Sequence, residues 1–217
     1  MIKDNFDRYS WQPIKIKDLV ELLEFKKEKI GLFIVDRYEE MLEELFLLRN
    51  PKYKFNKEYK NDFKEFRKSY SHQGNWFYFP WLNMVIRYLP EVDHLELRTG
   101  RNKNLVTKEE QEKFYNSHVA VFGMSVGSHV ALTLSMSGGA KSITLADLDI
   151  ISGSNLNRIR AGFSQVGVAK VKSVARQIYE INPYTEDIIY EEGVTEDNLY
   201  KIFNYTLTKK NFFTREI

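Results

Sequence analysis

The spacing of apolar residues changes twice between residues 118 and 146. The run His118-Val-Ala-Val-Phe122 is rich in β-forming residues, which predicts a buried strand. From Gly123 the spacing becomes helical and continues to about Met136. The run Ser142-Ile-Thr-Leu-Ala146 then predicts a second strand. This order of strand, glycine turn, helix and strand predicts a βαβ unit with a parallel sheet.

The first hundred residues have a different pattern, rich in lysine, glutamate and aromatic residues and poor in glycine. Apolar residues recur at helical spacing between Val35 and Leu48, which predicts a helix ended by Asn50-Pro51. The run Trp76–Phe79 predicts a strand that Pro80 ends, whereas Trp81–Leu89 has the spacing of a short buried helix.

Aromatic residues also recur every three or four positions from Phe55 to Tyr70, and lysines occupy the other faces of this predicted helix. A basic, aromatic helix could contact nucleic acid or a membrane surface. Glu58, Asp62 and Glu65 dilute its positive charge, however. This composition favours an amphipathic helix with its aromatic side in a core and its lysines in water.

The glycine turn is the first candidate site. It reads Gly123-Met-Ser125-Val-Gly127-Ser128, and a helix that begins at such a turn directs unpaired N–H groups and its positive dipole end toward an anion. Asp147 follows the second strand 24 residues after Gly123, where mononucleotide-binding βαβ units carry a ribose-binding acid. The pattern predicts an adenine-nucleotide site. The alternative is a turn whose small residues only allow close helix–sheet packing.

The turn departs from the dinucleotide pattern G-x-G-x-x-G. Ser125 stands where the second glycine would let the backbone approach a pyrophosphate, and Ser128 stands in the third place. This departure counts against ordinary NAD or FAD binding. An NAD(P)-dependent oxidoreductase is therefore a less favoured alternative.

Further polar motifs follow the second strand. They are Asp147-Leu-Asp149, then Ser154-Asn155-Leu-Asn-Arg158, then Gly167-Val-Ala-Lys170 at the start of a predicted helix, and Ile181-Asn-Pro183 at its end. In this order they resemble the ThiF/MoeB/HesA family of ubiquitin-activating-type adenylyltransferases. The resemblance covers about residues 98–193 and suggests a divergent branch with a long N-terminal extension.

This resemblance implies a specific chemistry. Members of the family use ATP and Mg²⁺ to adenylate the C-terminal carboxylate of a small β-grasp protein, such as a ubiquitin-like sulfur carrier, or a related acid. By resemblance, Asp147 would hold the ribose hydroxyls, and Asn155, Arg158 and Lys170 would line the triphosphate. Asp149 would also belong to the nucleotide site. Arginine and lysine suit this role because they bind phosphate as a planar fork and as a point charge.

Arginine in a turn before the first strand is a further family feature, and it reaches a nucleotide across a homodimer interface. The candidate is Arg101, 22 residues before Gly123, in preference to Arg98. The alternative is an ordinary basic loop. Thr107 and Glu110 then form a capping-box pattern that predicts a helix over 108–115.

After Gly193 the sequence predicts one short helix over 195–203, capped by Thr195, and no buried strand. Family members carry a later strand whose aspartate binds magnesium. We therefore expect a truncated chain that lacks this metal ligand, and we predict no metal site within it. A non-catalytic module that binds a nucleotide or a β-grasp partner is the corresponding alternative to an active adenylyltransferase.

Together these patterns predict an α/β chain with two regions. Residues 1–96 form a mainly helical, aromatic-rich region, and residues 97–217 contain the N-terminal half of a ThiF-type nucleotide domain. The expected sheet is a partial doubly wound, Rossmann-like parallel sheet.

The composition excludes some kinds of site but does not indicate a function. The 217 residues include no cysteine, which excludes disulfides, cysteine–zinc sites and a thioester cysteine within this sequence. The formal net charge of +2 argues neither for nor against nucleic acid, and we predict no nucleic-acid partner. Residues 114–140 contain no charged side chain, but a buried strand and helix explain them better than a membrane span. The N-terminus lacks a secretory signal, so we expect a cytoplasmic protein.

Overall fold

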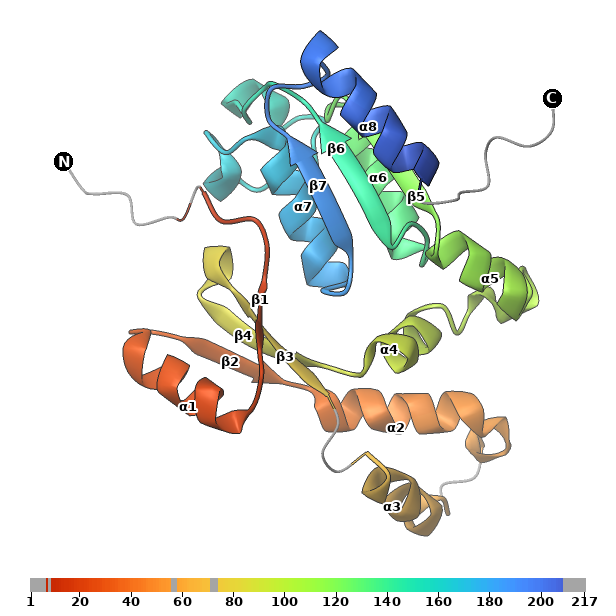
Figure 1. Cartoon of the computed structure of the whole chain (residues 1–217). Coiled ribbons are helices and arrows are strands. Elements are labelled where there is room, and N and C mark those ends of the chain that lie inside the picture. The colour runs from red at the N-terminus through yellow and green to blue at the C-terminus, as the bar shows by residue number, and fades with distance from the viewer. Residues whose placement is uncertain (1–6, 8, 56–57, 71–73, 209–217) are drawn as a thin grey trace. The chain divides into compact units, whose positions relative to one another are not determined.

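The computed structural model describes residues 7, 9–55, 58–70 and 74–208 (Figure 1). The chain divides into two compact units. One contains residues 13–105, and the other contains residues 106–208 together with the described part of the first twelve residues. We call them the 13–105 unit and the 106–208 unit.

The 106–208 unit is built on a three-stranded parallel sheet, in the order β5-β6-β7. The strands are β5 (His118–Phe122), β6 (Ser142–Ala146) and β7 (Glu186–Tyr190). The helices are α5 (Lys108–Tyr115), α6 (Gly127–Met136), α7 (Lys170–Ile181) and α8 (Glu196–Thr208). The predicted βαβ unit and partial doubly wound parallel sheet are confirmed.

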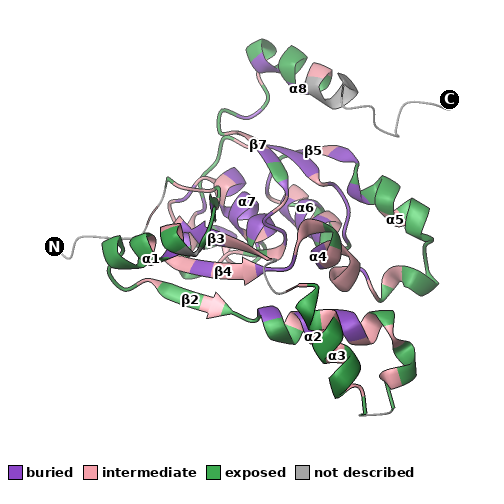
Figure 2. Cartoon of the chain, turned by 60° about the horizontal axis from the view of Figure 1, so that its bottom comes forward, coloured by how far each residue is buried: buried purple, intermediate pink, exposed green. Residues whose placement is uncertain are grey.

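The core of this unit lies between the sheet and two helices. Every residue of β6 is buried, and Ile143 and Leu145 pack with Val121 of β5 and with Val171 and Ile178 of α7. Figure 2 shows that α7 is largely buried, whereas α5 is largely exposed. In Figure 1, α8 lies on the face of the sheet opposite α6 and α7.

Sequence signals set several boundaries in this unit. The Thr107 side chain accepts a hydrogen bond from the Glu110 N–H, and the Glu110 side chain accepts one from the Thr107 N–H, so the predicted capping box is confirmed. Thr195 likewise accepts from the Asn198 N–H before α8. Helix α8 runs to Thr208, beyond its predicted end at Phe203, and residues 209–217 lie outside the described residues.

A buried arginine holds the described residues near the N-terminus, 7 and 9–12, in this unit. The Arg176 side chain on α7 is only 1% exposed, and its guanidinium donates to the carbonyls of Asp7 (2.6 Å) and Ser10 (2.7 Å). Trp11 packs near Tyr179, with 6.3 Å between the ring centroids. These contacts join positions about 166 residues apart in the sequence.

The 13–105 unit contains a four-stranded sheet in the order β1-β3-β4-β2. Its strands are β1 (Ile14–Ile16), β2 (Phe33–Asp36), β3 (Asn75–Phe79) and β4 (Met84–Tyr88). Its helices are α1 (Leu19–Glu28), α2 (Tyr38–Arg49), α3 (Lys60–Lys68) and α4 (Glu91–Arg98). Pairing is antiparallel except between β2 and β4, which run parallel. The prediction of a mainly helical region recognised β3 but left out the rest of this sheet.

One helix prediction is wrong. Residues 81–89 form the end of a short 3-10 helix, Pro80–Leu82, and the strand β4. Asn83 takes a left-handed conformation, with φ 47° and ψ 47°, and turns the chain so that Phe79 pairs with Met84. A short apolar run fits a buried strand as well as a buried helix, and pairing with β3 decided between them.

The aromatic stripe is shorter than predicted but packs as expected. Phe63, Phe66 and Tyr70 pack against a core formed by Tyr38, Leu42, Leu45 and Leu89. Phe55 is 91% exposed and takes no part. The amphipathic interpretation is therefore confirmed for the residues of α3.

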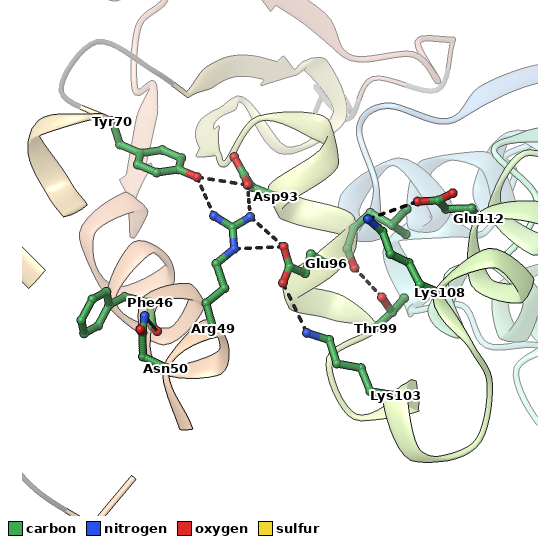
Figure 3. A network of polar contacts seen from close by, with 11 residues as sticks. Phe46, Arg49, Asn50, Tyr70, Asp93, Glu96, Thr99, Lys103, Lys108 and Glu112 are labelled. Atoms are coloured by element: carbon green, nitrogen blue, oxygen red, sulfur yellow. Dashed lines mark hydrogen bonds and ion pairs between the residues drawn. The ribbon is translucent and has the colours of Figure 1, made fainter. Parts of the chain in front are cut away.

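A polar network lies beside this core (Figure 3). Arg49, at the end of α2, donates to Glu96 (2.7 Å), Asp93 (2.6 Å) and the Tyr70 hydroxyl (2.8 Å). Lys103 forms a further ion pair with Glu96 at 3.3 Å. Burial alone would raise the pKa of Glu96, but hydrogen bonds and charge from Arg49 and Lys103 hold it below its ordinary value. The network therefore ties α2, α4 and the turn after α4 together.

No helix among the described residues combines the length and apolar character needed to cross a membrane. The charge-free run of residues 114–140 is occupied mainly by β5 and α6.

Candidate nucleotide-binding site

The glycine turn begins where β5 ends. Gly123 has φ +79°, in the left-handed region that favours glycine, and its N–H donates to the Ala146 carbonyl at 2.8 Å. A Cβ at this position would meet no atom within 4 Å, so backbone conformation rather than space explains the residue. Helix α6 then starts at Gly127. Its N-cap residue is Val126, whose side chain offers no acceptor to the first N–H groups.

Gly127 has a different reason to be a glycine. A Cβ there would lie 2.8 Å from Val121 Cγ1 and 3.5 Å from the Phe122 carbonyl oxygen. Close packing of α6 on β5 therefore explains Gly127 without a ligand. Ser125 is half-buried in the turn, and its carbonyl accepts from the Ser128 hydroxyl at 2.8 Å.

The structure places Asp147 beside this turn. One carboxylate oxygen accepts from the Met124 N–H at 2.5 Å, and the other accepts from the Asp149 N–H at 2.8 Å. Asp147 follows β6 directly, and β5 and β6 are parallel neighbours, so their carboxyl ends meet at one edge of the sheet. The acid and the glycine turn are thus brought together as the spacing predicts.

Lys170 is held at the same edge. Its ammonium nitrogen lies 2.6 Å from an Asp149 carboxylate oxygen, and its side chain is 8% exposed whereas that of Asp149 is 58% exposed. Backbone bonds join the two segments, from the Lys170 N–H to the Asp149 carbonyl (2.9 Å) and from the Ile151 N–H to the Val168 carbonyl (2.8 Å). The G-x-x-K and D-x-D motifs therefore form one local structure.

The loop between these motifs carries the other predicted residues. Asn155 is 7% exposed, and its side-chain oxygen accepts from the Ser152 N–H at 3.0 Å, so Asn155 stabilises its own loop. Arg158 is exposed, and its Nη1 donates to the Ser154 carbonyl and to the Asn157 side-chain oxygen, both at 2.9 Å. Arginine has five N–H donors, and these bonds use only Nη1. Its guanidinium therefore keeps donors and charge for an anion.

His129 was not singled out from the sequence. Its Nε2 lies 2.8 Å from the Arg158 carbonyl oxygen, and a carbonyl only accepts, so this nitrogen carries the proton. The bond links the first turn of α6 to the loop of Arg158. The spacing of histidines along a sequence does not reveal a backbone partner 29 residues away.

Arg101 lies in the 13–105 unit. It is exposed, precedes the 3-10 helix Asn102–Asn104, and lines a cavity of about 570 Å³ together with Arg98 and apolar residues of α2 and α4. Its proposed reach to a nucleotide stays a prediction.

Asp187 has a strongly shifted pKa, but it lies away from the glycine turn and Asp147. Burial raises its pKa well above the ordinary value, and neither carboxylate oxygen has a hydrogen-bond partner among the described residues. It stands near the amino end of β7, whereas the Tyr190 carbonyl at the other end accepts from the Asp147 N–H. Asp187 therefore belongs to the core rather than to the carboxyl edge of the sheet.

Within the described residues, no group of three His, Asp or Glu side chains could hold a metal ion. A nucleotide-bound Mg²⁺ needs fewer protein ligands, because phosphate oxygens and water supply the others. Asp149 is the most exposed acid at this edge, but it is paired with Lys170.

Comparisons with known proteins match this part of the chain. A model described as the ThiF family matches residues 99–208, which include the glycine turn, the D-x-D motif and the loop of Arg158. The chain is 38% identical over 110 residues to a tRNA threonylcarbamoyladenosine dehydratase of Bacillus subtilis, covering 50% of this chain and 43% of that protein. It is also 36% identical over 124 residues to the uncharacterized protein MT1398 of Mycobacterium tuberculosis, covering 57% of this chain and 17% of that one.

A similar solved structure is that of Escherichia coli tRNA N6-threonylcarbamoyladenosine dehydratase in complex with AMP. The two share 30% identity with a TM-score of 0.50, over 54% of this chain and 48% of that one. The chain spans less than half the length of each of these relatives.

Proposed function

Because the chain belongs to the ThiF family, we propose that its 106–208 unit binds ATP and serves the adenylation of a carboxylate. The observation that carries the proposal is the hydrogen bond that joins the Asp147 carboxylate to the glycine turn before α6, at the carboxyl ends of β5 and β6. The Lys170 ammonium is paired with Asp149, two residues after Asp147, and the Arg158 carbonyl is bonded to His129 in the first turn of α6. The AMP complex of the Escherichia coli relative supports an adenine nucleotide as the ligand.

The proposed reaction needs little bond chemistry from the protein. A carboxylate oxygen attacks the α-phosphorus of ATP, the bond to the β-phosphate oxygen breaks, and pyrophosphate leaves. The product is a mixed anhydride of the acid and AMP. Positioning and charge neutralisation supply the rate enhancement, as in other phosphoryl-type transfers. Mg²⁺ would add charge neutralisation on the phosphates.

Each residue has a role in this proposal. Asp147 receives the ribose hydroxyls, and the free N–H groups of the α6 N-terminus receive a phosphate. Arg158 and Lys170 neutralise the triphosphate, and Asn155 fixes the loop from which Arg158 extends. Lys170 would exchange its bond to Asp149 for a phosphate oxygen. Arg101 would reach the nucleotide from a second protomer of a homodimer.

The acceptor proposed from the family resemblance is the C-terminal carboxylate of a ubiquitin-like, β-grasp protein or another carboxylic acid, in the cytoplasm. The second candidate function is a module that binds the nucleotide or the β-grasp partner without turnover. The chain's match to less than half of each relative keeps this candidate, because further catalytic groups can lie in the unmatched parts.

Isothermal titration of the chain with ATP, with and without Mg²⁺, and with NAD tests the nucleotide proposal. We expect ATP binding that Arg158→Ala weakens about 10- to 100-fold, the usual effect of removing a charge-assisted hydrogen bond. Binding of NAD but not ATP would contradict the proposal. Pyrophosphate–ATP exchange that depends on an added carboxylic acid or β-grasp protein would separate the enzyme from the binding module.

A further inference from the structure

The N–H and the side chain of Arg158 bond to residues of its own loop. The Arg158 N–H donates to the Asn155 carbonyl at 3.0 Å, and its Nη1 contacts the Ser154 carbonyl and the Asn157 side chain. These bonds span at most four positions. They define the shape of the loop, but they do not fix its position against α6.

His129 supplies a bond that does join the loop to α6. It lies in the first turn of the helix, two residues after Gly127, and its Nε2 donates to the Arg158 carbonyl at 2.8 Å. Helix α6 also presents the N-terminus proposed to receive a phosphate. The bond therefore connects the two groups that would contact the same anion, one through backbone N–H groups and the other through a guanidinium.

Phosphate recognition depends on this kind of alignment. Charge-assisted N–H···O bonds are about 2.7–2.9 Å long, so a small displacement of the donor removes most of their advantage. A binding residue therefore reaches its full affinity only when neighbouring groups fix its position. The long Arg158 side chain is exposed, which makes the position of its backbone more important than it would be for a packed residue.

We propose that His129 is a positioning residue, which fixes the backbone of Arg158 against α6 so that the guanidinium reaches the phosphates of the bound nucleotide. The proposal rests on the nucleotide site proposed above. Nε2 donates a proton in this bond, and it remains a donor when the imidazole is protonated. The bond is therefore compatible with both charge states of the ring.

Three substitutions of His129 test whether its hydrogen-bond donor, rather than its ring as such, is needed. A glutamine side chain can place its amide nitrogen near the position of Nε2, whereas asparagine is too short and leucine has no donor. In titrations with ATP, we expect His129→Leu and His129→Asn to raise Kd about tenfold, a typical effect of one lost hydrogen bond. His129→Gln should stay within roughly threefold of the wild type. Thr133→Ala, one turn further along the exposed side of α6, is the matched control and should not change Kd.

A double-mutant cycle distinguishes positioning from simple stabilisation. Arg158→Ala removes the guanidinium but keeps the backbone carbonyl, so the bond from His129 remains. A structural role predicts that His129→Leu lowers the melting temperature equally in both backgrounds. Positioning additionally predicts that His129→Leu raises Kd only when Arg158 is present, because its effect on the ligand passes through that side chain.

The outcomes separate this inference from the proposed function. If wild-type protein binds no ATP, the proposed function fails and the inference fails with it. If wild-type protein binds ATP and Arg158→Ala weakens binding while His129→Leu does not, only the inference fails. It also fails if His129→Leu raises Kd equally with and without Arg158. We expect His129→Leu to weaken ATP binding only in protein that retains Arg158, and His129→Gln to bind ATP nearly as well as the wild type.

Discussion

Two groups of charged side chains, one in each unit of this chain, are held in different ways. In the 13–105 unit, Arg49 contacts the side chains of Asp93, Glu96 and Tyr70, so each charge is met by another side chain. In the 106–208 unit, Asp147 accepts from two backbone N–H groups, and Arg158 donates to uncharged oxygens. The first arrangement is saturated and holds helices together. The second fixes loops while leaving charge available to a ligand.

Lys170 stands between these two arrangements. It is paired with Asp149, but it is buried while its partner is exposed. An incoming phosphate can therefore compete for an ammonium that is already held in place. The comparison predicts that substitutions in the Arg49 network change stability, whereas those around the glycine turn change ligand affinity.

The largest effect is expected from Arg49→Met. It leaves Asp93, whose side chain is 13% exposed, without this cation, and it leaves Glu96, which is 28% exposed, with only its longer ion pair to Lys103. We expect the free energy of unfolding in urea to fall by about 2–3 kcal/mol. The matched control is Arg67→Met, which removes an ion pair to Glu39 whose partners are 56% and 50% exposed. This control should cost at most about 1 kcal/mol, and equal losses would show that the network is no more stabilising than a surface pair.

The second-largest effect is expected from Lys170→Gln, and it concerns the affinity for ATP. We expect Kd to rise about tenfold, because the ammonium is lost from the phosphate site. Lys172→Gln is the control, since Lys172 also forms a close ion pair, to Glu191 at 2.7 Å, but lies two positions further along α7. A similar loss of affinity in both variants would mean that net charge, rather than the position of Lys170, controls binding.

Asp187→Asn is expected to stabilise the 106–208 unit. Burial raises the pKa of Asp187 in the folded state, so the folded state favours the protonated carboxyl. The stability that this protonation contributes is complete below the unfolded-state pKa near 3.8, and it is lost as pH rises through the folded-state pKa. The asparagine variant does not ionise, so at pH 8 it should gain about 1 kcal/mol over the wild type. Thermal melts from pH 8 down to pH 4 should show this gain shrinking. Glu186→Gln, an exposed neighbour on β7, is the control; a gain that does not depend on pH would contradict the explanation.

Smaller effects are expected from the helix caps, and these compare the two units directly. Thr107→Ala removes the capping box of α5, and Asp18→Ala removes the acceptor for the Val20 and Glu21 N–H groups at α1. Each should cost about 0.5–1 kcal/mol in urea denaturation. A loss well above this range would indicate a tertiary role for the capping side chain.

The fold of the 106–208 unit could be predicted from sequence because its signals are local. The strands at 118–122 and 142–146, the Thr107 cap and the opening of α7 at Lys170 each follow from adjacent residues. The same signals placed Asp147 beside the glycine turn, because the ends of neighbouring parallel strands meet. Ser125 and Gly127 were predicted as parts of the turn, but only the structure shows that packing accounts for Gly127.

Long-range pairing explains what the sequence did not show. Strands β1 and β2 are short, and β4 has an apolar run that fits a helix equally well, so their identity depends on partners elsewhere in the chain. The burial of Arg176 depends on carbonyls near the N-terminus, and the role of His129 depends on a carbonyl 29 residues away. Every residue has a backbone carbonyl, so the sequence does not show which one will be the partner.

Amide NMR shifts on titration with ATP would show directly whether the nucleotide binds at the glycine turn. We expect the largest changes at the N–H groups of residues 123–128, at Asp149, and in the loop of residues 152–158. We also expect a change at Lys170, and only small changes in the 13–105 unit outside the turn of Arg101. Large changes confined to the 13–105 unit, with residues 123–158 unaffected, would contradict the proposed nucleotide site and place it elsewhere.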